Sequence, residues 1–405
     1  MNSYPIMSLA TAGVAVLDCE HKTPRATSEG KPYIAIPNVR EGKLDLTNVR
    51  FISLSDYQVW TRRTKPQVDD IVLTRRARVG DTAVIPPGLD CALGQNLVIL
   101  RSEGSIIGQP FLRWLVRGPE YWDQVYKYQN EGAVFSSLNV RDISKFQLSV
   151  PPLSIQRRIA EILGRLDDKI EVNRRINRTL ERMAQALYKH WFVDFRPFQD
   201  GEFVESELGL VPEGCEVVTL DDLVEIEANI INPQKHADEV FDHYSIPAYD
   251  ERNLPVAEPG AAVKSGKYLI QSDRVLVSKL NPTNHRVWTV YAPQGRRSFS
   301  STEFIHYVCR TPVSWSFVNG YVRSQAFVDE LRSHVSGTTG SRQRVPPRVT
   351  MSFMLMKPPA NVLAEFDRLA GPYLRLIQRN LEENQTLAKT RDYLLPRLLT
   401  GEVEV

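Results

Sequence analysis

The chain has 405 residues, of which 42% are hydrophobic and 24% charged, and its formal net charge is +2. This length is too great for one ordinary core and predicts two to four folded units of globular composition. The sequence pI of about 8.2 supports nucleic-acid binding only weakly, because a basic domain would normally exceed about 9, but local basic clusters are present. No run of about 18 apolar residues occurs, which excludes a membrane-spanning helix.

The cysteines and the first apolar stretch bear on the compartment. The four cysteines lie far apart and none forms a CxxC pair, so neither a zinc site nor a disulfide framework is predicted: Cys19, Cys91, Cys215 and Cys309. Residues 9–17 are apolar but follow no Lys or Arg, which favours a first buried element over a secretory signal. We therefore expect a reduced, cytoplasmic protein.

In chain order, the pattern predicts globular and helical segments in alternation. Residues 1–150 hold short apolar runs, such as 71–73 and 97–100, punctuated by Gly and Pro as strands and turns would be. A long helix is predicted over 153–191 and a phenylalanine-rich link over 192–215. Strand-like runs return within 216–357, at 275–277 and 287–291, and a second long helix is predicted over 361–398. The expected segments are a first globular domain (1–150), a first helix with its link (151–215), a second globular domain (216–357), and a second helix with the tail (358–405).

Similar residue groups recur in the two halves of the chain in the same order and at a nearly constant separation. The pairs of anchors are Leu9 and Leu220, Tyr33 with Ile36-Pro37 and Tyr244 with Ile246-Pro247, Asp70 and Asp273, and the double prolines Pro151-Pro152 and Pro358-Pro359. Each match alone is weak, but their common order indicates an internal duplication.

The long helices carry the strongest part of this repeat. Stepping alternately by four and three residues from Ile159, and again from Phe366, picks out two mostly apolar rows of residues, which we call seams. This spacing is the heptad period of a coiled coil. Both seams have two asparagines at the same two places: Asn173 and Asn177, and Asn380 and Asn384. A buried Asn in a seam fixes register and partner at a cost in stability. We expect the helices to pack on each other as an antiparallel coiled coil, related by a pseudo-two-fold axis.

A simpler alternative is that each helix packs only on its own domain, with the asparagines facing solvent. Ile176 and Leu381 leave room for such a shift of face. The favoured fold class is α+β: two mixed α/β domains separated by two long helices that form an antiparallel coiled coil.

No motif for catalysis is present. The sequence lacks GxxxxGK[ST], GxGxxG after a strand, HExxH and GxSxG. Residues 281–284, Asn-Pro-Thr-Asn, partly match the Asn-Pro-Pro-aromatic tetrad of amino-group DNA methyltransferases. They lack the second proline and the aromatic residue that would stack a flipped base. We therefore interpret them as a turn. The pairs Asp167-Asp168 and Asp221-Asp222 fit solvated helix faces or helix N-termini.

Basic clusters in loop-like stretches are the remaining functional signal. Arginine in such loops can contact phosphates and, through a bidentate contact, guanine, whereas the simpler interpretation of any single cluster is a solvated surface. The candidate DNA-binding residues are Arg62, Arg63, Lys65, Arg75, Arg76, Arg78, Arg296, Arg297, Arg342 and Arg344.

The first helical region holds a run of further motifs: Pro151-Pro152, Gln156-Arg157, Leu166-Asp167-Asp168, Asn173, Asn177, Leu180-Glu181 and residues 191–195. This run resembles the central conserved region of the specificity (S) subunits of Type I restriction–modification systems. The tail resembles their C-terminal conserved region, with Asn384, Leu387 and residues 394–403, and the openings at 17–24 and 211–214 resemble starts of their target-recognition domains. One departure is the second half, where Pro359 is followed by Ala-Asn-Val, so docking of a second partner there could differ.

The resemblance implies a DNA-binding subunit without catalysis or cofactors of its own. Each globular domain would read one half of a split double-stranded DNA target, and the coiled coil would set the gap between the halves. Two methyltransferase (M) subunits would dock on the helical regions and restriction (R) subunits would join them, with S-adenosylmethionine, ATP and magnesium all belonging to these partners. No membrane is expected to take part. Two rivals stay open: an adaptor whose domains bind proteins, and an enzyme, such as a nuclease, with a degenerate site.

Overall fold

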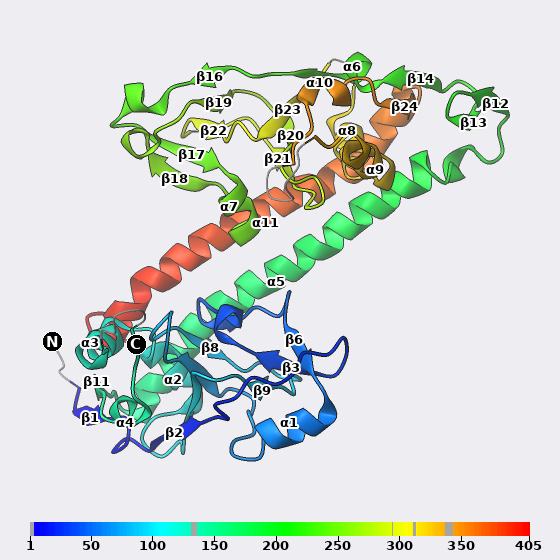
Figure 1. Cartoon of the computed structure of the whole chain (residues 1–405). Coiled ribbons are helices and arrows are strands. Elements are labelled where there is room, and N and C mark those ends of the chain that lie inside the picture. Colours follow the sequence, from blue (N-terminus) through cyan, green and yellow to red (C-terminus); the bar gives the residue numbers. More distant parts are fainter. Residues whose placement is uncertain (1–3, 131–135, 294, 311–312, 337–342) are drawn as a thin grey trace. The chain divides into compact units, whose positions relative to one another are not determined.

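The computed structural model describes residues 4–130, 136–293, 295–310, 313–336 and 343–405. The chain forms two compact units: Met1–Glu171 together with Asn384–Val405, and Val172–Glu383. Each unit combines strands and short helices with part of two long helices, α5 (Leu153–Phe192) and α11 (Ala360–Thr400) (Figure 1). Among the described residues, no helix combines the length and the apolar character that crossing a membrane requires.

The first unit is built on a four-stranded antiparallel sheet. Its order is β2 (Val14–Asp18), β10 (Leu97–Ser102), β7 (Ile71–Thr74) and β8 (Thr82–Val84). Successive residues of a strand point to opposite faces, and here both faces are covered, so β7 is buried along its whole length. Ile71 and Leu73 join one core cluster, whereas Val72 joins another. This explains why residues 71–73 and 97–100 form continuous apolar runs.

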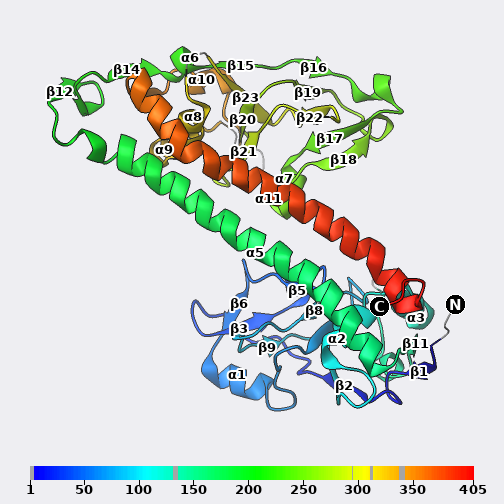
Figure 2. The ribbon, with the colours of Figure 1, turned by 180° about the vertical axis from the view of Figure 1, so that it is seen from behind.

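Helices and smaller sheets cover the two faces of this sheet. The first core includes residues of α2 (Gln109–Leu115), α3 (Pro119–Tyr128), α4 (Val140–Ile143) and the start of α5. The other side holds the sheet β6 (Arg50–Ile52), β3 (Lys31–Ile34) and β9 (Ala92–Leu93), on which α1 (Leu54–Trp60) packs (Figure 2). Two short antiparallel pairs complete the unit: β1 (Ile6–Ser8) with β11 (Gln147–Ser149), and β4 (Val39–Arg40) with β5 (Lys43–Leu44).

The second unit repeats this plan. Its four-stranded sheet has the order β15 (Val224–Ile226), β23 (Phe304–Cys309), β20 (Arg274–Ser278) and β21 (Val287–Val290). One face packs on α8 (Trp315–Val322), α9 (Gln325–Ser333) and both long helices. The other face packs on α7 (Ile246–Arg252). Smaller elements are α6 (Leu220–Leu223), α10 (Pro347–Thr350), and the pairs β14 (Glu216–Thr219) with β24 (Met354–Lys357) and β12 (Phe203–Ser206) with β13 (Gly209–Pro212).

The strand order confirms the internal duplication. In chain order, β2, β7, β8 and β10 occupy the same sheet positions as β15, β20, β21 and β23. The repeated anchors Tyr33 and Tyr244 both lie in strands with a parallel neighbour, β3 beside β9 and β17 (Val240–Tyr244) beside β22 (Ser298–Ser300). The halves differ in their second sheet, which has three strands in the first unit. In the second unit it has five: β18 (Val256–Pro259) pairs with β17 as β6 pairs with β3, and β19 (Lys267–Ile270) and β16 (Ile230–Ile231) extend the sheet beyond β22.

The long helices have nearly the predicted bounds and pair in opposite directions. In the second unit, Asn177 of α5 contacts Asn380 of α11, while Phe192, further along α5, contacts Phe366, which lies earlier in α11. In the first unit, Asp167 of α5 contacts Arg391 of α11. These contacts confirm the antiparallel helix pair, in which each half of the pair also contributes to the core of its unit.

Candidate nucleic-acid interface and helix contacts

The loop that follows α1 carries three predicted DNA-binding residues on a well-anchored backbone. Arg62, Arg63 and Lys65 are exposed. The guanidinium of Arg101 donates to both carboxylate oxygens of Asp70, at 2.7 and 2.6 Å, and to the carbonyl oxygen of Lys65 at 3.1 Å. The loop therefore has a fixed path while its basic side chains extend into solvent, an arrangement that suits contacts with phosphates.

Lys65 lies near the same carboxylate, that of Asp90, as Lys31, which the sequence analysis did not single out. The Asp90 carboxylate lies 2.6 Å from the ammonium of Lys31 and 3.7 Å from that of Lys65, and it accepts a hydrogen bond from the hydroxyl of Tyr57. The hydrogen bond from Lys31 lowers the pKa of Asp90, while burial and the hydrogen bond to Asp90 raise the pKa of Tyr57 to about 12. Two ammonium groups around one carboxylate leave a net positive charge beside Arg62 and Arg63.

The arginines after β7 differ in role. The guanidinium of Arg75 is only 13% exposed and donates to the carbonyl oxygen of Leu138 at 3.2 Å, so Arg75 joins two segments of the fold. Arg78 forms an ion pair with Asp81 at 2.6 Å. Arg76 is exposed and, within the described part of the chain, its side chain has no ion pair or hydrogen bond. Of these three, Arg76 is therefore the one best placed for an external anion.

The predicted arginines of the second unit are paired with carboxylates. Arg296 lies 2.8 Å from Asp242, and Arg297 lies 3.0 Å from Glu239. Arg344 donates to both oxygens of Glu303, at 3.0 and 2.8 Å, and this hydrogen bond lowers the pKa of Glu303. All three guanidinium groups are nearly half exposed, and such pairs are weak enough for a phosphate to compete. Arg342 lies outside the described residues.

The seam asparagines are buried between the two long helices. The amide nitrogen of Asn380 donates to the amide oxygen of Asn177 at 2.8 Å, and that of Asn177 donates to the carbonyl oxygen of Ile377 at 3.2 Å. Asn173 donates to Glu383 at 2.8 Å, and Asn384 is buried as well. The alternative with solvent-facing asparagines is therefore wrong. Buried amides need partners, and these partners meet only at this helix register, so the register role of all four remains our prediction.

Asp167 is a correction to the sequence interpretation. It is 4% exposed instead of solvated, and its carboxylate lies 2.8 Å from Arg113 and 2.7 Å from Arg391, with Arg117 at 3.9 Å. Burial alone would raise its pKa, but the hydrogen bond and charge of Arg391 outweigh burial and lower it. This cluster joins α2, α5 and α11 within the first unit and explains why an arginine occupies a seam position. No local pattern reveals this cluster, because Arg113 of α2 and Arg117, just after α2, lie far from Asp167 in the sequence.

The structure confirms two smaller sequence interpretations and gives a structural reason for a third. The backbone N–H of Asn284 donates to the backbone carbonyl oxygen of Asn281 at 2.8 Å, which confirms a turn. Asp222 forms a capping box with Thr219 at the start of α6. Gln156, part of the first helical motif, is buried and bonds the backbone of Gly108. In the described ranges, no cluster of three or more His, Cys, Asp or Glu side chains could hold a metal ion.

Comparison with known proteins agrees with this architecture. Residues 19–182 match the family model of the Type I restriction modification DNA specificity domain. The specificity subunit of the Type I restriction enzyme MjaIX from Methanocaldococcus jannaschii is 25% identical over 349 residues, which cover 83% of this chain and 78% of that protein. The HindI specificity subunit from Haemophilus influenzae is 34% identical over 105 residues, or 25% of this chain and 22% of that protein.

A solved structure has the same fold. The crystal structure of a Type I restriction–modification S subunit from M. genitalium superposes with a TM-score of 0.59 over 98% of this chain and 96% of that one, at 13% identity. The family model and the relatives' names all describe a specificity component. Together with the repeated strand order and the paired helices, these matches show that the chain is similar, over most of its length, to specificity subunits of Type I restriction–modification systems.

Proposed function

We propose that this chain reads a split DNA target, with each globular part contacting one half, and that it positions methyltransferase and restriction subunits there. The observation that carries the proposal is the repetition of one strand order in both units, each followed by a long helix of 40 or 41 residues. Two copies of one recognition fold suit a bipartite target, just as paired DNA-binding elements suit paired half-sites.

The helix pair would set the gap between the half-sites. A helix of 40 residues is about 60 Å long at 1.5 Å per residue. The Asn177–Asn380 hydrogen bond and the Asp167–Arg391 ion pair oppose sliding of one helix along the other. We propose that a pair of helices locked in this way serves as the ruler.

The helices also offer surface for partners. Val172, Ile176 and Met183 of α5 are exposed, and their spacing of four and seven residues puts them on one face of the helix. An exposed apolar stripe of this kind suits a protein partner. We expect two methyltransferase subunits to dock along the helical regions and restriction subunits to join them. S-adenosylmethionine, ATP and magnesium would be bound by those subunits. Because the target would be chromosomal and invading DNA, we expect the complex in the cytoplasm.

A protein adaptor remains the second candidate, since Arg296, Arg297 and Arg344 are neutralised by carboxylates. The test is selection of duplexes from a random DNA library by the chain together with its cognate methyltransferase. Enrichment of one motif with two defined halves and a fixed gap is expected. No enrichment, from a complex that has assembled, would favour the adaptor.

A further inference from the structure

Three backbone segments of the second unit meet where the central strand β20 ends. The N–H of Lys279, the residue after β20, donates to the carbonyl oxygen of Glu303 at 2.9 Å, and its carbonyl oxygen accepts from the N–H of Val345 at 3.1 Å. Arg344, which precedes Val345, exchanges two backbone hydrogen bonds of 2.9 Å with Ser336. Glu303 and Arg344 are therefore held on fixed backbone positions of neighbouring segments.

The first unit has the same junction with different side chains. The N–H of Arg75, the residue after β7, donates to the carbonyl oxygen of Asn96 at 2.8 Å, so Asn96 corresponds to Glu303. Ser137 corresponds to Arg344, since each forms an antiparallel bridge with the second residue after the central strand. The two units thus present different side chains on one shared backbone frame, as readers of two different half-sites require.

In the second unit this junction holds an exposed ion pair with a free edge. Nε and Nη2 of Arg344 donate to the two carboxylate oxygens of Glu303, at 3.0 and 2.8 Å. A guanidinium has five N–H donors, and the described residues provide no acceptor for Nη1. The Arg344 side chain is 47% exposed. The carboxylate therefore fixes the plane of a guanidinium whose other edge, formed by Nη1 and Nη2, is available to a ligand.

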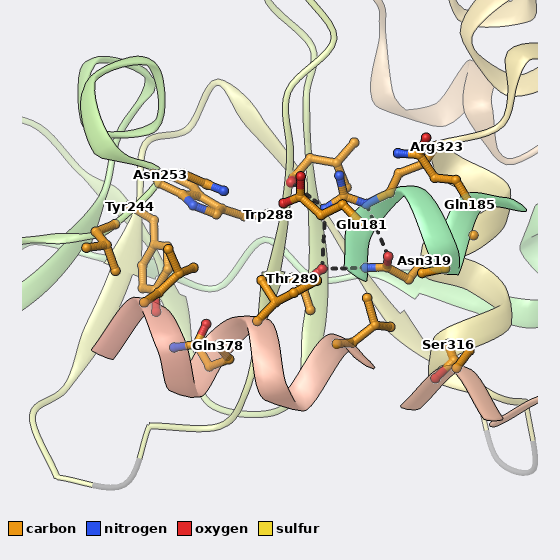
Figure 3. A pocket seen from close by; sticks show the side chains of 18 of the residues that line it. Glu181, Gln185, Tyr244, Asn253, Trp288, Thr289, Ser316, Asn319, Arg323 and Gln378 are labelled. Carbon is orange, nitrogen blue, oxygen red and sulfur yellow. Dashed lines mark hydrogen bonds between the residues drawn. The ribbon is translucent and has the colours of Figure 1, made fainter. Parts of the chain in front are cut away.

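Other arginines of the second unit serve the fold. Arg323 donates to the amide oxygen of Asn319 at 3.1 Å (Figure 3) and to the carbonyl oxygen of Val287 at 2.8 Å. Arg274 is completely buried. These two guanidinium groups join segments of the unit, whereas that of Arg344 is both exposed and oriented by its partner.

This arrangement suits a guanine better than a phosphate. The major-groove edge of guanine offers two acceptors, O6 and N7, to a bidentate arginine. A phosphate approaching Arg344 would also meet the negative charge of Glu303, and such repulsion disfavours the wrong ligand. On the basis of the DNA-reading function proposed above, we propose that Arg344 reads a guanine in the half-site of the second unit and that Glu303 is the positioning residue for its guanidinium. The first unit has Ser137 in place of the arginine, so this contact belongs to one half-site only.

The test replaces Arg344 by lysine, which keeps the charge but has no planar fork of donors. Duplexes are selected from a random library by the chain assembled with its cognate methyltransferase, and base frequencies are compared in each half of the enriched motif. The wild type should prefer guanine about tenfold at one position of one half, and Arg344→Lys should reduce this preference to about twofold or less. The other half should not change, because the other unit reads it.

Arg310→Lys is the matched control. The Arg310 side chain is also 47% exposed, and it lies 3.7 Å from the carboxylate of Asp221. Arg310 follows the six-residue strand β23, whereas Glu303 precedes it, so the two ion pairs lie at opposite ends of this strand. The control should therefore enrich the same motif as the wild type.

Glu303→Gln tests the positioning role. It removes the charge that repels phosphates, so binding to duplexes without the motif should tighten about threefold while the guanine preference falls. A merely structural ion pair would leave binding to these duplexes unchanged or weaker, which would contradict the role of Glu303.

The outcomes separate this contact from the DNA-reading function. If the assembled wild-type complex enriches no motif, the DNA-reading function is contradicted, and the guanine contact with it. If the wild type enriches a split motif and Arg344→Lys enriches it with the same base preferences, only the guanine contact is overturned. An equal loss of affinity for all duplexes would also overturn it, because Arg344 would then contact phosphates alone.

Discussion

Adding seven residues to each long helix should lengthen the gap of the recognised DNA target by about three base pairs. The insertions belong between Asp167 and Asn173 in α5 and between Glu383 and Arg391 in α11. These two places face each other, because Asp167 pairs with Arg391 and Asn173 pairs with Glu383. One heptad completes two turns of a coiled coil, so the contacts on both sides of the insertion keep their register.

The magnitude follows from the rise of the helix. Seven residues add about 10.5 Å at 1.5 Å per residue, which corresponds to about three base pairs of 3.4 Å. The assay is a map of methylated adenines, made by long-read sequencing of cells that express the variant with its methyltransferase. The two half-site sequences should stay the same while the gap grows.

A matched control inserts the heptad in α5 alone. The Asp167–Arg391 and Asn177–Asn380 contacts then cannot form together, and site-specific methylation should be lost. A gap unchanged in the double insertion, with methylation intact, would refute the proposal that the helices act as the ruler.

Three further predictions concern single side chains. Asn177→Leu leaves the buried amide of Asn380 without its acceptor and should lower the free energy of unfolding in urea by about 1–3 kcal/mol; an unchanged value would show that this amide finds another partner. Asp167→Asn should cost about 3 kcal/mol near neutral pH, since three partly buried arginines lose the charge of their buried carboxylate partner. The folded-state pKa of Asp167 is lowered, so its contribution to the free energy of unfolding is complete above the ordinary pKa of about 3.9 and is lost as the pH falls through the lower value. On acidification below about pH 4, the variant should therefore lose less stability than the wild type. An equal loss would contradict this assignment. Arg62→Ala should weaken binding to all duplexes and reduce the slope of log affinity against log salt by about 1, whereas Arg75→Ala should lower the melting temperature; an unchanged salt slope would place Arg62 away from the DNA phosphates.

The long helices could be predicted from the sequence because their information is local. The apolar seams gave the bounds of both helices to within two residues, and the paired asparagines indicated that the seams face each other. The duplication was also visible, since Asp70 and Asp273 precede corresponding central strands of the two sheets. Periodicity survives in the sequence whatever the tertiary structure adds.

The candidate interface could be predicted only coarsely. Sequence clustering grouped Arg75 with Arg76, yet one guanidinium is buried against Leu138 and the other is exposed. The carboxylates that neutralise Arg297 and Arg344 lie far from them in the sequence, so no local pattern reveals the pairs. Which basic side chain is available to DNA is decided by tertiary contacts, and residue type alone does not report them.

The central claim is that this chain is the reader of a split target. The most direct measurement maps methylated adenines across a genome that carries the cognate methyltransferase gene, first with the gene for this chain and then with it deleted. The account predicts that deletion abolishes methylation at one motif with two defined halves and a fixed gap. An unchanged map, with the methyltransferase expressed and active, would contradict the account and favour the adaptor.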